Sequence, residues 1–113
     1  MPVSMVIRGA RLNRMVKKMA TLGKAGTSSR VRLIPNGNYL KSIQLFNKLT
    51  KNAKSIKVEK LTNGRVRRIA DMGDKNFITF RNFDYSNTPN LVANIDLKFH
   101  KIWTKTRELK FIK

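Results

Sequence analysis

The sequence predicts an α+β domain in which N-terminal helices cover one face of a twisted antiparallel sheet of four or five strands. Two patterns lead to this class. Apolar residues recur every three to five positions in the first half of the chain, as in amphipathic helices, and at alternate positions in the second half, as in half-buried strands. The 113 residues, 41% of them hydrophobic, are enough for one modest core.

The first half of the chain predicts two helices. Residues 4–22 form a basic amphipathic pattern and residues 39–50 a second apolar stripe. Glycines and small polar residues at 23–30 interrupt the first pattern and predict a linker. We therefore divide the chain into a helix with its linker, residues 1–30, and an α+β domain, residues 31–113. The apolar positions of the first helix are Ile7, Leu12, Met15, Val16, Met19 and Leu22.

The second half predicts strands joined by turns. Alternating runs flank Asn63-Gly64, a pair that favours the positive φ angles of a tight hairpin. Further strands are expected in KNFITFRNF, at 92–100 and at 107–113, with a turn at 71–74 and a loop at 84–90. The apolar residues of these strands would face the helices, and the polar residues between them would face away.

That alternation predicts a polar site on the open face of the sheet. A metal-free ribonuclease needs a base for the ribose 2′-hydroxyl proton, an acid for the departing 5′ oxygen, and cations for the phosphate charge. Histidine suits either proton transfer, and arginine suits the phosphate. An ordinary solvated sheet face carries the same residue types without chemistry, so both interpretations stay open. The candidate catalytic residues are Thr79, Arg81, Ser86, Thr88, Asp96, Lys98 and His100.

The charge predicts an anionic partner. The chain has 25 Lys and Arg against 6 Asp and Glu, a net charge of +19, and nucleic acid is the commonest partner for such a surface. With no cysteine and one histidine, we expect neither a metal site nor a cofactor. The residues expected to bind nucleic acid are Arg65, Arg67, Arg68, Tyr85, Lys101, Trp103, Lys105, Arg107 and Lys110.

Residues 39–113 also contain an ordered series of short motifs. These are QLFNKLTKNAK (44–54), TNGRVRRI (62–69), FITFR (77–81), DYSNTP (84–89), ANIDL (93–97) and RELKFIK (107–113). The series resembles the C-terminal toxin domains of bacterial polymorphic and contact-dependent growth-inhibition systems. The resemblance matches Arg81 to a strand arginine, Ser86 and Thr88 to polar loop positions, and Asp96 to an Ile-Asp aspartate. Those domains often have glycines in the loop where this chain has Asn87, Pro89 and Asn90.

This resemblance implies a ribonuclease of the barnase, EndoU, colicin and RelE structural class. Such domains cut tRNA or other cellular RNA without a metal ion, and a cognate immunity protein, here expected to be acidic, neutralises them. The resemblance also implies a bacterial exported effector that acts in the target-cell cytoplasm, or a cytoplasmic protein if the chain is complete. No obligate membrane association is expected.

Two other functions remain open at the level of sequence. The first is a non-catalytic nucleic-acid-binding protein, such as a ribosome-associated or phage architectural factor, because the charge fits it equally well. The second is a membrane-directed or organelle-targeted protein, since residues 4–22 also resemble an Arg-rich transit peptide.

Overall fold

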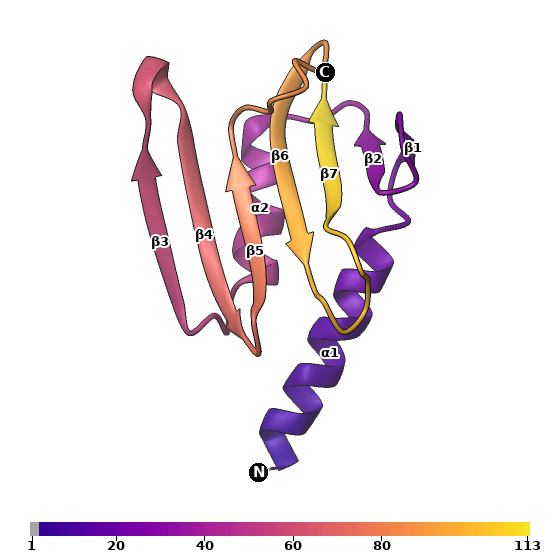
Figure 1. Cartoon of the computed structure of the whole chain (residues 1–113), viewed down its shortest axis with the longest axis vertical. Helices are drawn as coiled ribbons and strands as arrows, with labels where there is room; N and C mark the ends of the chain where they lie inside the picture. Colours follow the sequence, from indigo (N-terminus) through magenta and orange to yellow (C-terminus); the bar gives the residue numbers. More distant parts are fainter. Residues whose placement is uncertain (1–2) are drawn as a thin grey trace.

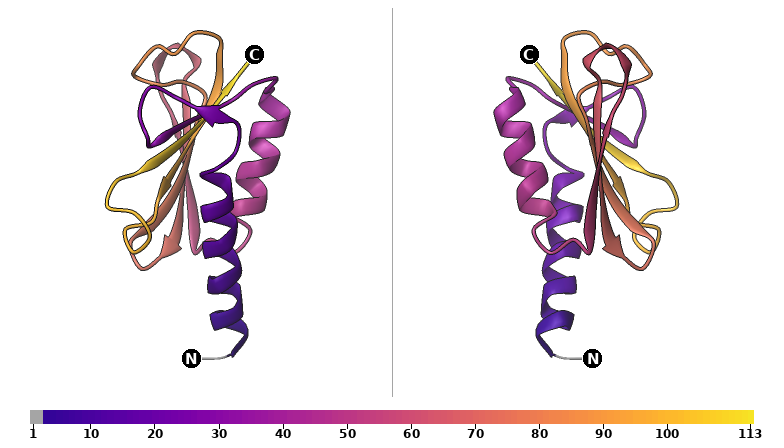
Figure 2. Two further views of the ribbon diagram at one scale, coloured as in Figure 1. Left: turned by 90° about the vertical axis from the view of Figure 1, so that its right-hand side faces the viewer. Right: turned by 90° about the vertical axis from the view of Figure 1, so that its left-hand side faces the viewer.

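The computed structural model describes residues 3–113, with side chains from Ala10 onward. The described chain has two α-helices and one seven-stranded sheet, and both helices lie behind the same face of the sheet (Figures 1 and 2). The predicted α+β class is therefore confirmed, whereas the expected four or five strands are too few. Neither helix of the described residues has the length and hydropathy needed to cross a membrane.

The second helix, α2 (Tyr39–Leu49), forms where its apolar stripe predicts it. The side chain of Asn38 accepts a hydrogen bond from the backbone nitrogen of Lys41 at 2.8 Å, which satisfies one of the free donors at the start of the helix. Phe46 and Leu49 are buried against the sheet. Burial of this stripe, more than local propensity, stabilises a helix of this length.

The first helix, α1 (Val3–Met19), is part of the same core. Val16 is fully buried, and Arg32 donates hydrogen bonds of 2.8 Å to the carbonyl oxygens of Leu22 and Gly23 just beyond the end of the helix. The helix thus packs onto the unit formed by residues 31–113, on the same side of the sheet as α2. The predicted apolar position Ile7 lies outside the described side chains.

The sheet has the order β1-β2-β7-β6-β5-β4-β3. Its strands β3 to β7 form an antiparallel meander, as predicted, but β2 pairs with β7 in parallel and β1 pairs with β2, so the whole sheet is mixed. The two extra strands come from residues that the sequence assigned to a linker and to the start of the domain. The strands are β1 (Lys24–Ala25), β2 (Val31–Ile34), β3 (Ser55–Lys60), β4 (Val66–Gly73), β5 (Asn76–Arg81), β6 (Leu91–Lys98) and β7 (Arg107–Ile112).

The predicted β3–β4 hairpin is confirmed. Asn63 and Gly64 have φ angles of 60° and 71° in the connection, the left-handed conformation that asparagine and glycine tolerate best. The hairpin extends the sheet beyond the helices, which leaves Ile56 and Val58 about half exposed.

The strand register separates an apolar face from a polar one. Ile95 of β6 pairs with Phe80 of β5 on one side and with Leu109 of β7 on the other, and all three are fully buried under the helices. One position further along, Arg81, Asn94 and Lys110 are neighbours on the opposite face, which no helix covers. Two connections, residues 82–90 and residues 99–106, project on this open side (Figure 2).

Candidate functional site

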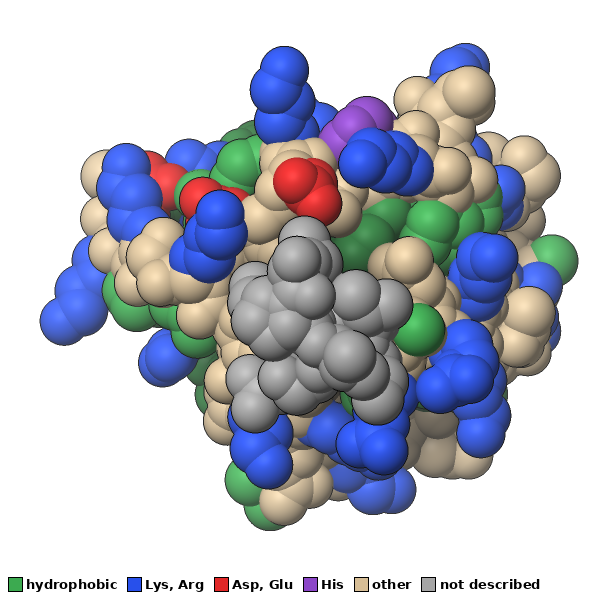
Figure 3. Space-filling view, turned by 90° about the horizontal axis from the view of Figure 1, so that it is seen from below, with side chains coloured by type: hydrophobic (Ala, Val, Ile, Leu, Met, Phe, Trp, Pro, Cys, Tyr) green, Lys and Arg blue, Asp and Glu red, His purple; other side chains and the backbone are tan. Residues whose placement is uncertain are grey.

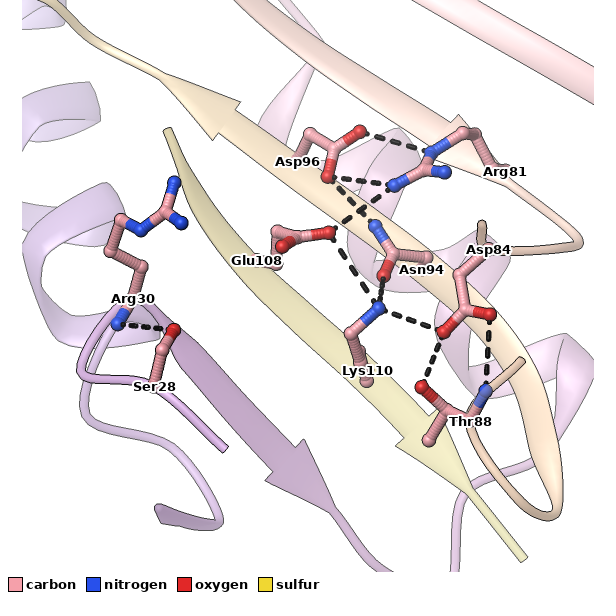
Figure 4. A network of polar contacts seen from close by, with 9 residues as sticks. All are labelled: Ser28, Arg30, Arg81, Asp84, Thr88, Asn94, Asp96, Glu108 and Lys110. Atoms are coloured by element: carbon pink, nitrogen blue, oxygen red, sulfur yellow. Dashed lines mark hydrogen bonds and ion pairs between the residues drawn. The ribbon is translucent and has the colours of Figure 1, made fainter. Parts of the chain in front are cut away.

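A network of polar side chains occupies the centre of the open face (Figure 4). Arg81 from β5 donates to both carboxylate oxygens of Asp96 from β6, with Nε to Oδ2 at 3.1 Å and Nη2 to Oδ1 at 3.2 Å. The same Nη2 donates to Glu108 Oε1 of β7 at 3.3 Å. One guanidinium therefore holds two carboxylates from two neighbouring strands, a geometry that the planar arginine fork favours.

Lys110 of β7 forms the second half of this network. Its Nζ donates to Asp84 Oδ2 at 2.8 Å and to Asn94 Oδ1 at 3.0 Å, and lies 3.6 Å from Glu108. The Asn94 amide donates in turn to Asp96 at 2.8 Å, so it connects the two halves. We define the polar network as Arg81, Asp84, Thr88, Asn94, Asp96, Glu108 and Lys110.

The 82–90 loop closes one side of the network. Asp84 accepts hydrogen bonds from the hydroxyl and the backbone nitrogen of Thr88, and the rings of Phe83 and Tyr85 lie 5.6 and 5.4 Å from the Arg81 guanidinium. Arg81 Nη1 is buried and has no hydrogen-bond partner among the described residues. The two rings thus cover one part of the guanidinium while the carboxylates hold another.

Burial sets the protonation of the network. Desolvation raises the pKa of Asp96 above its ordinary value, although the nearby Arg81 opposes this rise. Burial also acts to raise the pKa of Asp84, but the hydrogen bonds from Lys110 and Thr88 outweigh it and lower that pKa. The side chains of Asp96 and Glu108 keep 20% and 25% exposure, so these two carboxylates are the acidic groups of the network that solvent reaches.

A cavity of about 260 Å³ adjoins the network. Ser86 and Thr88 of the loop line it, together with Glu108 and Lys110 of β7. The other lining residues are Thr27, Val31, Leu33 and Pro89. A ligand in this cavity would therefore meet a carboxylate, an ammonium group and three hydroxyls.

The loop beside this cavity depends on two asparagines. Asn87 and Asn90 have φ angles of 51° and 60°, the left-handed region that glycine enters without strain and asparagine tolerates. These are positions at which the toxin domains described above often have glycine. The backbone conformation is thus one that either residue type can adopt.

Several predicted site residues meet in this arrangement. Arg81, Thr88, Asp96 and Lys110 belong to the network, Thr79 is the cross-strand neighbour of Asp96, and Ser86 lines the cavity. Three members of the network, namely Asp84, Asn94 and Glu108, are not among the candidates predicted from the sequence. Glu108 could have been found, because it lies two residues before Lys110 and shares its face by the same alternation.

Lys98 and His100 lie apart from the network. The strand predicted for residues 92–100 ends at Lys98, and His100 is exposed in the turn that follows. Among the described side chains, no hydrogen bond or ion pair joins either residue to the network. The row of Asp96, Lys98 and His100 expected on one strand is therefore interrupted, since the chain turns before His100.

The residues expected to bind nucleic acid are spread over several surfaces. Lys110 is only 4% exposed, so it is a buried ion-pair partner and not a surface cation. Arg67 pairs with Glu59 at 3.1 Å, and Arg68 belongs to the opposite face because its cross-strand neighbour is the buried Phe80. Arg65 lies over the ring of Phe83, Tyr85 and Lys101 are exposed, and Trp103, Lys105 and Arg107 lie together at a second cavity.

Basic side chains dominate the view from below, whereas acidic ones gather in one sector of it (Figure 3). Of the six acidic residues, four are held in ion pairs: Glu59, Asp84, Asp96 and Glu108. The electrostatic field that the protein presents to a partner is therefore strongly positive.

Comparisons of the chain with family models, curated proteins and solved structures find no match. Among the described side chains, no group of three or more His, Cys, Asp or Glu is placed to hold a metal ion.

Proposed function

We propose that the protein is a metal-independent endoribonuclease that cuts tRNA or another cellular RNA at the polar network. The observation that carries this proposal is the convergence of Arg81, Asp96, Glu108 and Lys110 on the uncovered face, where Glu108 and Lys110 also line a cavity. Fixed cations beside partly exposed carboxylates are the groups that phosphodiester transfer without a metal needs. The motif series of residues 39–113 adds the resemblance to toxin domains.

Glu108 is the group best placed to act as general base. It lines the cavity, and its carboxylate is oriented by Arg81 and Lys110. In the proposed step, Glu108 takes the proton of the ribose 2′-hydroxyl while the 2′ oxygen attacks phosphorus. The bond from phosphorus to the 5′ oxygen then breaks, leaving a 2′,3′-cyclic phosphate and a 5′-hydroxyl.

Arg81 and Lys110 would stabilise the negative charge that grows on the phosphate oxygens in this step. The departing 5′ oxygen takes its proton from solvent water, because His100 lies outside the network. The need for a 2′-hydroxyl restricts the reaction to RNA. Single-stranded loops, whose bases are unstacked, suit a shallow open face of this kind.

The proposal is tested with Glu108→Gln, which replaces one carboxylate oxygen by an amide nitrogen and so removes the proposed base. Wild-type protein and Glu108→Gln are incubated with total RNA and with tRNA in EDTA, and the new ends are mapped. We expect wild type to produce 2′,3′-cyclic phosphate ends, and Glu108→Gln to lose at least about 100-fold in rate, as loss of a general base does. Glu59→Gln is the matched control, because Glu59 has the same 25% side-chain exposure and also pairs with an arginine.

Three results would count against this proposal. Cleavage by a folded Glu108→Gln variant at the wild-type rate would remove Glu108 from the mechanism. Loss of cleavage in His100→Ala would show that the proton comes from the imidazole and not from water. If wild-type protein leaves every RNA intact, the enzymatic proposal itself is wrong.

An acidic protein inhibitor belongs to the same proposal. A protein with a net charge of +19 and most of its acids paired internally would capture a complementary acidic protein rapidly. An inhibitor of this kind would be expected to cover the open face and to stop the cleavage described above.

A second candidate function is nucleic-acid binding without cleavage. The specific observation in its favour is that Arg81 and Lys110 already hold carboxylates, while the single histidine lies apart. Such a protein binds RNA with a strong salt dependence and yields no new ends, with or without EDTA. The end-mapping experiment therefore separates the two candidates.

A further inference from the structure

A second cavity, of about 410 Å³, lies where β7 begins. The turn at residues 27–30 and the connection at residues 99–106 form its walls, so segments about 75 residues apart in the sequence meet there. We call it the Trp103 cavity. Its lining includes Ser29, Arg30, Ile102, Trp103, Lys105 and Arg107.

The charge of the Trp103 cavity differs from that of the polar network. Three of its lining residues are cations and none is acidic. In the network, Arg81 and Lys110 are neutralised by carboxylates, whereas among the described residues no carboxylate pairs with Arg30, Lys105 or Arg107. The positive charge at this cavity is therefore available to an anion from outside the chain.

Arg107 is held in a fixed orientation there. Its Nη1 donates to the carbonyl oxygen of Ser29 at 2.8 Å, and its guanidinium lies 5.2 Å from the centre of the Trp103 ring. Its Nε is buried without a hydrogen-bond partner among the described residues. A positioned guanidinium with free donors is suited to phosphate oxygens.

The cavity holds apolar surface as well as cations. Trp103 and Ile102 are partly buried against the core, so packing against the core holds the indole ring in place. A bare phosphate needs neither the volume nor the aromatic wall, whereas a nucleotide uses both, since bases stack on aromatic side chains and on arginine planes.

We infer that the Trp103 cavity binds one nucleotide of an RNA strand, with Arg30, Lys105 and Arg107 on its phosphate and Trp103 against its base. This inference rests on the proposal that RNA is the partner, and it adds where a nucleotide next to the cut is held.

Arg107 and Glu108 are consecutive in β7, and the Glu108 nitrogen donates to the Arg30 carbonyl at 2.8 Å, so the two sites are neighbours along the chain. The side chains of Arg107 and Glu108 point to opposite faces of the sheet, because Arg107 pairs with the buried Leu97 and Glu108 pairs with Asp96. A bound RNA strand therefore has to pass round the start of β7 to reach from the cavity to the network.

Trp103 is the only tryptophan in the chain, so its fluorescence reports on this cavity alone. The full chain is titrated with adenosine 5′-monophosphate, with adenosine and with inorganic phosphate. We expect saturable quenching by the nucleotide, at a concentration at least about tenfold lower than for either part, because only the nucleotide makes both sets of contacts. A mononucleotide has no internucleotide bond, so this readout does not depend on cleavage.

The cations are tested in the double variant Arg30→Gln, Lys105→Gln. Loss of two charge-assisted contacts should raise the nucleotide concentration for half-maximal quenching about tenfold or more. Lys57→Gln is the control, because Lys57 is an exposed cation on the edge strand β3 and does not line the cavity. It should leave the titration unchanged.

Absence of saturable quenching by the nucleotide would overturn the inference, as would quenching that the double variant does not weaken. Equal affinity for phosphate and nucleotide would overturn the stacking of a base on Trp103. These outcomes are distinct from failure of the proposed function. Cleavage without quenching rejects the nucleotide site alone, and quenching without cleavage rejects the ribonuclease alone.

Discussion

At the scale of single residues, the sequence predicts a surface cation at Lys110, but in the structure Lys110 forms a buried ion pair with Asp84. Alternation along β7 correctly places Lys110 on the face away from the helices. The 82–90 loop then covers that position, and the two side chains keep only 5% and 2% exposure. Removing one partner of such a buried ion pair strongly destabilises the folded protein, because the other charge stays buried without a partner.

Asp84→Asn should therefore destabilise the protein by about 3 kcal/mol near pH 7. The native pKa of Asp84 is lowered below 3.8, so folding favours its ionised form. The stability from this carboxylate is fully present above pH 3.8 and is lost as the pH falls through the lowered native pKa. The difference in unfolding free energy between wild type and variant, measured by urea denaturation, should accordingly shrink in acid.

The opposite sign holds for Asp96, whose pKa is raised. The protonated form of Asp96 is favoured in the folded protein, so its contribution to the free energy of unfolding is lost as the pH rises from 3.8 through the raised native pKa. The pH dependence of wild-type stability therefore combines the opposite contributions of Asp84 and Asp96. Asp74→Asn is the control for Asp84→Asn, because Asp74 is exposed in a turn, and it should change stability by less than about 0.5 kcal/mol. A pH-independent difference for Asp84→Asn would contradict the assignment.

At the scale of elements, α1 shows which contacts of a helix its sequence pattern leaves undefined. Its apolar period is visible in the sequence, but the period does not say what the apolar side covers. In the structure Val16 is fully buried among core residues, and Arg32 of β2 binds the carbonyl groups that follow the helix. Periodicity reveals an amphipathic helix, whereas its partner depends on contacts between distant residues.

Val16→Ala tests whether α1 stabilises the domain. Removing two buried methyl groups should lower the free energy of unfolding by about 1.5–2.5 kcal/mol, since each buried carbon contributes about 0.8 kcal/mol and a cavity remains. Val58→Ala is the matched control, because Val58 is 49% exposed on β3 and should lose less than about 0.5 kcal/mol. Equal effects of both changes in urea denaturation would show that α1 is not part of the folded core.

Among the strands, some follow from local sequence and others depend on a distant pairing partner. The hairpin at Asn63-Gly64 is a local feature, set by two residues that accept positive φ angles, and the sequence predicts it correctly. β1 and β2 are short, and β2 exists as a strand because β7 supplies its hydrogen-bonding partner. A strand of four residues has too few positions for an alternation to stand out.

At the scale of the whole molecule, the excess of positive charge predicts strongly salt-dependent binding to RNA. For single strands the slope of log affinity against log salt is about −0.7 for each phosphate contacted. Replacing Lys98, Lys101 and Lys105, which are all exposed near the end of the open face, by glutamine should make this slope less steep by about 2. Filter binding at several salt concentrations measures the change.

Lys57→Gln, on the distant edge strand β3, is the control for that triple variant and should alter the slope by less than about 0.7. If the triple variant keeps the wild-type slope, RNA does not contact this end of the molecule. The result is independent of cleavage, because the Glu108→Gln protein can be used throughout.

The α+β class, the meander of β3 to β7 and the face on which Arg81, Asp96 and Lys110 lie all follow from the amino-acid pattern, because period and turn chemistry are local properties. Which cations lack a carboxylate partner depends instead on how distant segments pack together. The 82–90 loop covers Lys110, β6 ends before it can carry His100, and Arg30 meets Arg107 across a parallel pair. Each of these outcomes depends on residues far apart in the chain, whose distances no local pattern contains.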